Sequence, residues 1–261
     1  MVTPTKTQIT TPPREARSEP ERYAALPEAV RHRIDAVRCV VASDFDEVES
    51  AHDIHHLDRV ARLAAVIAYE EAADPAVAGL AAYVHDYHRL VEQQDREGRQ
   101  DHDSATLIDA ALDRAGVRQA DRPAVLTAVD ATGRFTFSDR HRTPEDTVAA
   151  CLHDADMLDA MGAIGVARAF LYGGALGEPM WNADGPLQTT YRSGPTSSVV
   201  AHFYEKLVHL REELHTPTGR ELAEERHAFL EAFLERFHQE WGDAGSPHDP
   251  RARGAPSEEP A

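Results

Sequence analysis

The hydrophobic positions along this chain recur mainly with the period of an α-helix. The clearest segment is 54–69, whose apolar residues lie three and four positions apart and share one face: Leu57, Val60, Ala61, Ala64, Ile67 and Ala68. Because proline fits the first helical turn, Pro75 predicts another helix that runs towards His88. Thr143, followed by a proline and two acidic residues, predicts the N-cap of a helix that continues through Leu158.

The same periodicity predicts further helices at 28–42, 104–115, 121–131, 162–171, 197–213 and 219–241. No segment alternates apolar and polar residues for long enough to form a convincing strand, so the chain is expected to be all-α. One long irregular connection, 172–195, is rich in glycine and proline. Loops of that length are usually lids, binding loops or disordered segments, and the sequence favours neither a lid nor a plain connection.

The two ends of the chain differ in composition from its centre. Residues 1–22 and 242–261 each contain four of the 16 prolines, which is typical of flexible tails. The centre, 23–241, contains the periodic segments and is long enough for one large domain. We therefore predict a single folded domain over 23–241 between two flexible tails.

The charge balance excludes some partners. The chain has 45 acidic residues against 27 lysines and arginines, a formal net charge of −18. The negative electrostatic field of such a chain argues against binding to a nucleic-acid polymer or to an anionic membrane surface. The start of the chain has no apolar signal segment, and no apolar run approaches the roughly 18 residues of a membrane span. Two cysteines without the spacing of a disulfide framework favour a reducing compartment, so we expect a cytoplasmic protein.

Three short strings combine histidine and aspartate with apolar neighbours, each on a different expected helix. They contain His52 and His56 in 51–60, His85 and Asp86 in 82–86, and Asp154, Asp156 and Asp159 in 152–159. Apolar flanks draw these groups towards the core, where uncompensated charge is costly. Buried acids and imidazoles from different helices can satisfy one another around a divalent cation. A mixed nitrogen and oxygen donor set suits Mn, Fe, Co, Zn or Mg.

His56, then His85 and Asp86, then Asp156 resemble the H…HD…D signature of the HD superfamily of metal-dependent phosphohydrolases. Each element alone is a weak signal, but three in order on three expected helices form a strong one. The resemblance extends to a bacterial subgroup related to HD-type nucleotide pyrophosphohydrolases, through the segments 52–60, 154–170, 202–207 and 223–227. It covers about 28–241 and implies an HD-domain helical bundle.

The resemblance implies one divalent metal ion held by His56, His85, Asp86 and Asp156. Asp154 is the alternative aspartate, but it lies two residues from Asp156, on nearly the opposite face of a helix. Asp159 either orients a ligand from the second shell or forms an ordinary capping or surface ion pair. Additional histidines could hold a second metal: His88, His102, His141 and His153.

The implied reaction is hydrolysis of a small phosphorylated substrate, a nucleotide, with release of pyrophosphate or phosphate. Asp86 would orient or deprotonate the attacking water. Lys206 is the main candidate for binding phosphate, with His202 one turn earlier on the same helical face. Arg168 is a second cation for the substrate, and His52 would contact the substrate or donate a proton to the leaving group.

Several positions depart from the family pattern, so the substrate is not inherited from the resemblance. Met157 stands where arginine is usual, and Asp86 is followed by Tyr87, His88 and Arg89 rather than by a small residue and an acid. Arg59 is either a further substrate cation or part of a structural ion pair. Two other functions stay open: a di-iron oxygenase or lyase of the same fold, and a non-catalytic ligand-binding domain. We also expect that exposed apolar faces could pair two copies as a homodimer.

Overall fold

The computed structural model describes residues 17–45, 52–96, 103–133, 146–187 and 196–242. Every regular element in these ranges is helical, which confirms the predicted all-α fold. In chain order the elements are α1 (Glu19–Ala24), α2 (Glu28–Asp44), α3 (Ile54–Glu70), α4 (Pro75–Val84), α5 (Tyr87–Arg96), α6 (Ser104–Arg114), α7 (Arg122–Gly133), α8 (Thr147–Asp159), α9 (Gly162–Ala175), α10 (Val199–Glu205), the 3₁₀-helix η2 (Leu207–Glu213) and α11 (Pro217–Trp241).

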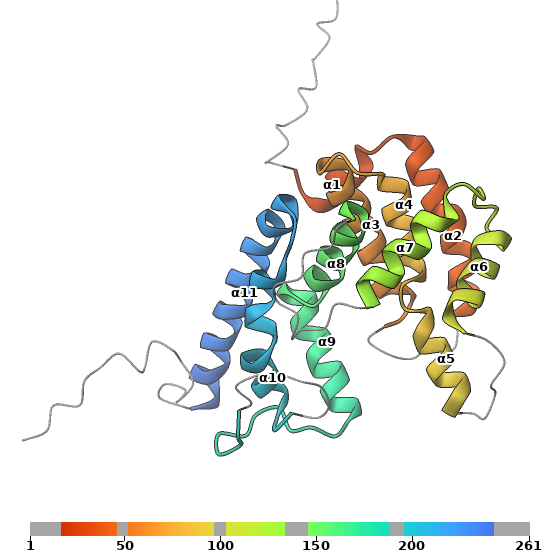
Figure 1. Ribbon diagram of the computed structural model, residues 1–261. Helices are drawn as coiled ribbons and strands as arrows, with labels where there is room; N and C mark the ends of the chain where they lie inside the picture. The colour runs from red at the N-terminus through yellow and green to blue at the C-terminus, as the bar shows by residue number, and fades with distance from the viewer. Residues whose placement is uncertain (1–16, 46–51, 97–102, 134–145, 188–195, 243–261) are drawn as a thin grey trace, which may run out of the picture.

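Helices α3, α4 and α8 form the centre of the bundle. Helix α4 has no charged residue and is buried over nine of its ten positions, which is the pattern of a helix surrounded by others. Figure 1 shows α9, α10 and α11 on one side of this centre and α2, α5, α6 and α7 on the other. The apolar core runs through both groups, so the described ranges pack around one continuous core.

Local capping explains where the central helices begin. Asp53 is the N-cap of α3, and its carboxylate accepts a hydrogen bond from the backbone N–H of His56 at 2.9 Å. Asp74 caps α4, with Pro75 in the first turn as predicted. The predicted cap at Thr143 lies outside the described residues; helix α8 begins at Thr147, capped by Asp146.

Two predicted helices are each divided into two elements. The helix predicted from Pro75 towards His88 ends at Val84, and α5 begins at Tyr87. The helix predicted over 197–213 ends at Lys206, whose φ and ψ of −135° and −60° leave the helical region. The chain continues as the 3₁₀-helix η2, in which residues three apart share a face, so Leu207 and Leu210 are both buried.

The folded part of the chain begins earlier than the boundary predicted at residue 23. Helix α1 begins at Glu19, and Arg22, which we assigned to the tail, is buried and donates hydrogen bonds to Glu70 and Glu221. At the other end α11 stops at Trp241, close to the predicted boundary. The remaining parts of both predicted tails lie outside the described residues.

The connection predicted over 172–195 is shorter than expected, because α9 extends to Ala175. Its last part, 188–195, lies outside the described residues, so the choice between a lid and a plain connection stays open. No helix in the described ranges combines the length and the apolar character that crossing a membrane requires.

Candidate functional site

The structure brings His56, His85, Asp86 and Asp156 together where α3, α8 and the α4–α5 junction meet. His56 lies in the first turn of α3 and is fully buried. His85 is the C-cap of α4, and Asp86 lies between it and α5. Consecutive residues of an unbroken helix point about 100° apart, so the break between α4 and α5 lets both adjacent side chains reach one site.

The separations between these side chains fit ligands of an ion within two overlapping trios, namely His56 with His85 and Asp156, and His56 with His52 and Asp86. His56 Nε2 lies 3.6 Å from Asp86 Oδ2 and 3.5 Å from Asp156 Oδ1. His85 Nε2 lies 3.6 Å from Asp86 Oδ1 and 3.9 Å from Asp156 Oδ1. All four separations are too long for hydrogen bonds. Two atoms that each bind an ion at about 2.0–2.2 Å can be up to about 4.4 Å apart.

The tautomers of the two histidines are set by their other ring nitrogens. His56 Nδ1 lies 2.8 Å from Asp159 Oδ2, and His85 Nδ1 lies 2.7 Å from the carbonyl oxygen of Ala82. Because an ionised carboxylate and a carbonyl oxygen only accept, both Nδ1 atoms carry the hydrogen, and each neutral ring keeps its lone pair on Nε2.

When the rings are neutral, the two Nε2 lone pairs face carboxylate oxygens, an arrangement that is repulsive unless a proton or a metal cation lies between them. His56 Nε2 is buried without a hydrogen-bond partner. A buried polar atom in that state is costly, and a divalent cation would satisfy it together with both carboxylates. The donor set of two imidazoles and two carboxylates thus fits the metal that the sequence predicted.

Both carboxylates of the cluster are held ionised. Burial by itself would raise the pKa of Asp86, but the imidazoles of His85 and His52 and the guanidinium of Arg89 lower it well below its usual value. For Asp156, burial likewise opposes ionisation, and the positive charges that His85 and His56 carry when protonated outweigh it and lower the pKa. Both side chains are therefore present as anions at neutral pH, the form that binds a cation.

Asp159 orients His56, so the geometry supports the first of its two predicted roles, the positioning of a ligand, over a capping or surface ion pair. The carboxylate is almost fully buried and also accepts hydrogen bonds from Arg59, at 2.6 and 3.0 Å, and from Arg168 at 2.9 Å. Burial opposes ionisation, but the hydrogen bonds from His56 and Arg59 lower the pKa of Asp159 below its ordinary value. Arg59 therefore forms a structural ion pair, and its partner is Asp159.

Asp154 has a different role from Asp156. It is fully buried and accepts hydrogen bonds from the backbone N–H of His215 and of Thr216, at 2.9 and 2.7 Å, and from the Thr216 hydroxyl. A Cβ on Gly219 would lie 2.4 Å from Asp154 Oδ2, so glycine is needed for this close approach. Asp154 thus holds the beginning of α11 and does not join the cluster.

The predicted second metal site does not assemble from the described residues. His88 is half exposed, and His153 lies beside Asp154 with its ring against that of His215. Neither belongs to a group of side chains that could bind an ion together. His102 and His141 lie outside the described residues.

His52 joins the cluster on its open side. Its Nδ1 lies 2.9 Å from Asp86 Oδ2, and it can form a second trio of donors with Asp86 and His56. Since the carboxylate is the acceptor, Nδ1 is the donor of this hydrogen bond. Burial is the main cause of a lowered pKa at His52, which keeps the ring neutral at pH 7.

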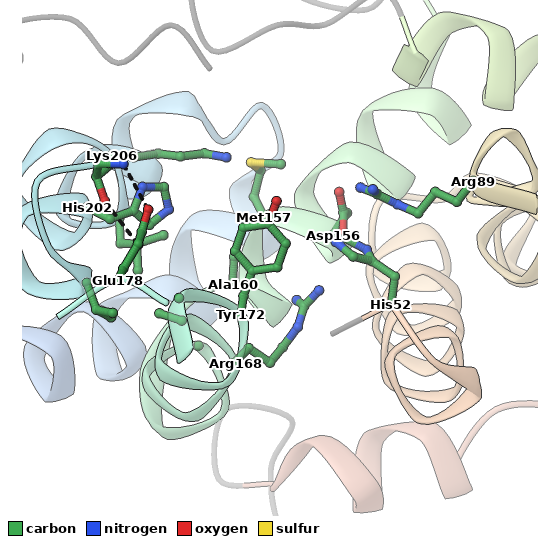
Figure 2. Close-up of a pocket in the computed structure, with 16 residues that line it drawn as sticks. His52, Arg89, Asp156, Met157, Ala160, Arg168, Tyr172, Glu178, His202 and Lys206 are labelled. Atoms are coloured by element: carbon green, nitrogen blue, oxygen red, sulfur yellow. Dashed lines mark hydrogen bonds between the residues drawn. The ribbon is translucent and has the colours of Figure 1, made fainter. Parts of the chain in front are cut away.

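A cavity of about 320 Å³ adjoins the cluster and is lined by His52 and Asp156. Three cationic side chains also line it: Arg89 from α5, Arg168 from α9 and Lys206 from the end of α10. In Figure 2, His52 and Arg89 lie on the same side as Asp156, and Lys206 and His202 lie on the opposite side. The cavity therefore combines a metal-binding cluster with positive charge inside an acidic protein.

The three residues that the sequence assigned to the substrate all line this cavity: Lys206, His202 and Arg168. Burial lowers the pKa of Lys206, with nearby Asp156 opposing the shift. Burial and the neighbouring Lys206 lower the pKa of His202 to about 4, so His202 is uncharged at neutral pH.

Arg89, one of the positions that depart from the family pattern, also lines the cavity, and of the other polar lining residues the sequence marked neither Tyr172 nor Glu178. The position of Arg89 gave a usable signal, because it lies three residues after Asp86, and its Nε donates to Asp86 Oδ1 at 3.1 Å. Tyr172 and Glu178 lie at the end of α9 and just beyond it, and nothing in the local sequence marks them.

Comparison with known proteins places this fold and site in a family. No family model matches the chain. The chain is 33% identical over 209 residues to the uncharacterized protein YpgQ of Bacillus subtilis (strain 168), which covers 79% of this chain and 92% of YpgQ. The crystal structure of YpgQ in complex with ADP matches with a TM-score of 0.60 and 30% identity, over 79% of this chain and 97% of that one.

Two further crystal structures carry the superfamily name. An HD-superfamily hydrolase from Bacillus thuringiensis matches with a TM-score of 0.63 and 27% identity, over 82% of this chain and 98% of that one. A predicted HD superfamily hydrolase from an uncultured Thermotogales bacterium matches with a TM-score of 0.51 and 27% identity, over 87% of this chain and all of that one. The chain belongs to the HD superfamily. This confirms the resemblance drawn from its motifs, and HD-superfamily relatives support a metal-dependent hydrolase in general terms.

Proposed function

We propose that this HD-superfamily protein hydrolyses a nucleotide with the help of one divalent metal ion, and that its leading reaction is release of pyrophosphate from a nucleoside triphosphate. The observation that carries the proposal is the cavity that connects the His–Asp cluster with Arg89, Arg168 and Lys206. A phosphomonoesterase activity that uses the same residues is the second candidate function.

The residues of the cluster have separate tasks in this proposal. His56, His85, Asp86 and Asp156 hold the ion, and Asp159 keeps the lone pair of His56 directed towards it. A bound divalent ion supplies Lewis acidity that polarises a phosphoryl group and activates water.

The three cations supply the charge that the rest of the chain lacks. A phosphate chain would be repelled by a protein of net charge −18 unless the local field were reversed. Arg89, Arg168 and Lys206 bring positive charge to the cavity wall, where Arg89 also pairs with Asp86 and Arg168 with Asp159, and a bound divalent ion would add to that charge. During phosphoryl transfer the negative charge is spread over the phosphoryl oxygens, and prearranged cations stabilise it without reorganisation.

Asp86 keeps the predicted role of metal ligand, and His52 keeps the predicted proton transfer. Both oxygens of Asp86 already accept hydrogen bonds, Oδ2 from His52 and Oδ1 from Arg89. We therefore assign Asp86 to binding the ion and holding His52. With Nδ1 donating to Asp86, the neutral ring of His52 would accept a proton at Nε2 from the attacking water and then pass it to the leaving group, and His52 lines the cavity where that group would lie.

The size and the lining of the cavity support a small-molecule substrate. Pockets for such ligands measure about 300–1,000 Å³ and are largely apolar. Here Met157, Tyr172, Val199 and Leu207 add apolar surface beside the cations. The crystal structure of the relative YpgQ with ADP supports a nucleotide as the ligand class.

Product analysis with a panel of divalent metals tests this function. The purified protein should release pyrophosphate from nucleoside triphosphates only in the presence of Mn, Fe, Co, Zn or Mg. The variant Asp156→Ala should be inactive, while Asp113→Ala, at an exposed position on α6, should match the wild type. Release of phosphate alone would favour the phosphomonoesterase. Activity that survives complete removal of metal, or in Asp156→Ala, would contradict the proposal.

A further inference from the structure

The cavity has two chemically different ends. One end, at the metal cluster, carries Arg89 and Arg168. The other end carries Glu178, Thr196, which is hydrogen-bonded to it, and His202, beside which the Lys206 side chain begins (Figure 2). In Figure 2, Glu178 and His202 lie across the cavity from Asp156, and the Lys206 side chain extends towards Met157. Positive charge is thus available near the metal cluster, and the far end presents a carboxylate, a hydroxyl and a neutral imidazole.

Glu178 is held in place by the chain around it. Its Oε1 accepts a hydrogen bond from the backbone N–H of Thr196 at 2.9 Å, and its own backbone N–H donates to the carbonyl of Gly173. The next residues are tied to the start of α10, because the N–H groups of Val199 and Val200 donate to the carbonyls of residues 179 and 180. The carboxylate therefore lies on a braced segment beside the cavity.

The second oxygen of Glu178 keeps most of its acceptor capacity. Oε2 lies 3.4 Å from the Thr196 hydroxyl, whose hydrogen also has a shorter contact of 2.9 Å with the carbonyl of Ser198. A carboxylate offers about four lone-pair sites, so a ligand can still donate hydrogen bonds to Glu178. A phosphate group is disfavoured there, because it is an anion whose oxygens are mainly acceptors.

These contacts set the direction in which a nucleotide would bind. Its phosphates are attracted to the metal and the cations and repelled by Glu178, so its nucleoside lies at the far end. Resting on the proposed function, we propose that Glu178 is a specificity-determining residue that accepts hydrogen bonds from the nucleoside, either from sugar hydroxyls or from N–H groups of the base. His202, which the sequence assigned to the substrate, then contacts the nucleoside as well.

Equilibrium binding tests this inference without depending on turnover. The ligands are ADP, its 2′-deoxy analogue and inorganic pyrophosphate, titrated calorimetrically in the presence of the divalent ion. The variant is Glu178→Gln, in which the amide oxygen can still accept from Thr196. Loss of a hydrogen bond to a charged group should weaken ADP binding by about 10–100-fold. Pyrophosphate, which has no nucleoside, should bind as tightly as to the wild type or slightly more tightly.

A weaker affinity for ADP together with an equal or stronger affinity for pyrophosphate distinguishes a specific contact from a general effect of charge. Removal of one negative charge from the cavity favours every anion, so a purely electrostatic role of Glu178 would tighten ADP and pyrophosphate together and would overturn the inference. Glu224→Gln makes the same chemical change at an exposed position on α11 and should alter neither ligand. Glu178→Asp keeps the charge and serves as the second variant should Glu178→Gln unfold.

The 2′-deoxy analogue identifies the donor. If Glu178→Gln removes a preference of the wild type for ADP over the analogue, the contact is with the 2′-hydroxyl. An equal loss for both ligands places it on the base or the 3′-hydroxyl. Unchanged ADP affinity in Glu178→Gln, or a wild type that binds pyrophosphate but not ADP, would overturn the inference. Tight ADP binding by a protein that hydrolyses neither nucleoside triphosphates nor nucleoside monophosphates would instead contradict the proposed function alone.

Discussion

Asp159 offers the sharpest test of how the metal ligands are positioned, through the substitution Asp159→Asn. The wild-type carboxylate accepts from His56 Nδ1 and from two arginines, and it is 1% exposed. The amide has one acceptor oxygen for these three donors, and its NH₂ group must face another donor. Either His56 keeps the oxygen, with a weaker and neutral partner, or it loses the oxygen and turns its Nδ1–H away.

Either arrangement should weaken the binding of the metal ion. With a neutral partner, His56 is a weaker base and therefore a weaker ligand. Without the partner, the hydrogen is no longer held on Nδ1, so it can move to Nε2, the atom that should bind the ion. Replacement of such an outer partner typically lowers metal affinity by about 10–100-fold, which corresponds to about 1.4–2.7 kcal/mol. Metal affinity is measured by competition with a chelator of known affinity, on the metal-depleted protein.

Asp58→Asn is the matched control, because it also removes a buried carboxylate that pairs with an arginine. Asp58 lies two residues after His56 on the same helix and accepts from Arg38, at 2.7 and 2.8 Å, and from the Tyr83 hydroxyl. Both variants should lose about 1–3 kcal/mol of stability in the metal-depleted state. Only Asp159→Asn should lose metal affinity. Equal metal affinity in the two variants would refute the positioning role of Asp159.

Three further results are expected. Lys206→Ala should lower turnover by about 10²–10³-fold; unchanged turnover and substrate affinity in a steady-state assay would exclude Lys206 from phosphate binding. Gly219→Ala places a Cβ 2.4 Å from Asp154 Oδ2 and should cost about 1–3 kcal/mol in thermal unfolding, whereas Gly174→Ala, with no neighbour within 4 Å, should cost nothing. The pKa of His202 in the folded state is lowered from 6.5 to about 4, so the unfolded chain binds its proton first. Stability should therefore be highest above pH 6.5 and fall towards pH 4, and His202→Asn should flatten this part of the curve.

The helices and the donor cluster could be predicted because the signals for both are local. Asp53 and Asp74 with Pro75 mark helix starts through hydrogen bonds that span three residues or fewer. The order His56, His85–Asp86 and Asp156 places donors on three buried segments, and the packing of α3, α4 and α8 brings them together. Asp156 was separable from Asp154 because residues two apart lie on different helix faces.

The features that the sequence did not reveal depend on contacts between distant parts of the chain. The 3₁₀-helix after Lys206 forms because Leu207 and Leu210 meet the core together, which the helical period alone does not indicate. Arg22 belongs to the folded domain because it pairs with Glu70 and Glu221, 48 and 199 residues away. Glu178 is held beside the cavity by the hydrogen bond that it accepts from the backbone N–H of Thr196, which follows the end of the predicted loop.

Two expectations stay predictions: the homodimer and the cytoplasmic location. Several large apolar side chains are exposed near the end of α9 and beyond it, namely Leu171, Tyr172, Leu176 and Met180. They provide apolar surface on which two copies could pair. Nothing in the described residues tests either expectation.

Metal content is the measurement that tests the central claim most directly. The protein is incubated with each divalent ion, freed of loosely bound ion by gel filtration, and analysed by mass spectrometry for ions per chain. The account predicts one ion per chain in the wild type and in Asp58→Asn, and less than about a tenth in His56→Ala and Asp156→Ala. No bound ion in the wild type, or full occupancy in the two ligand variants, would contradict it. Two irons per chain with a visible absorption band would point instead to the di-iron chemistry.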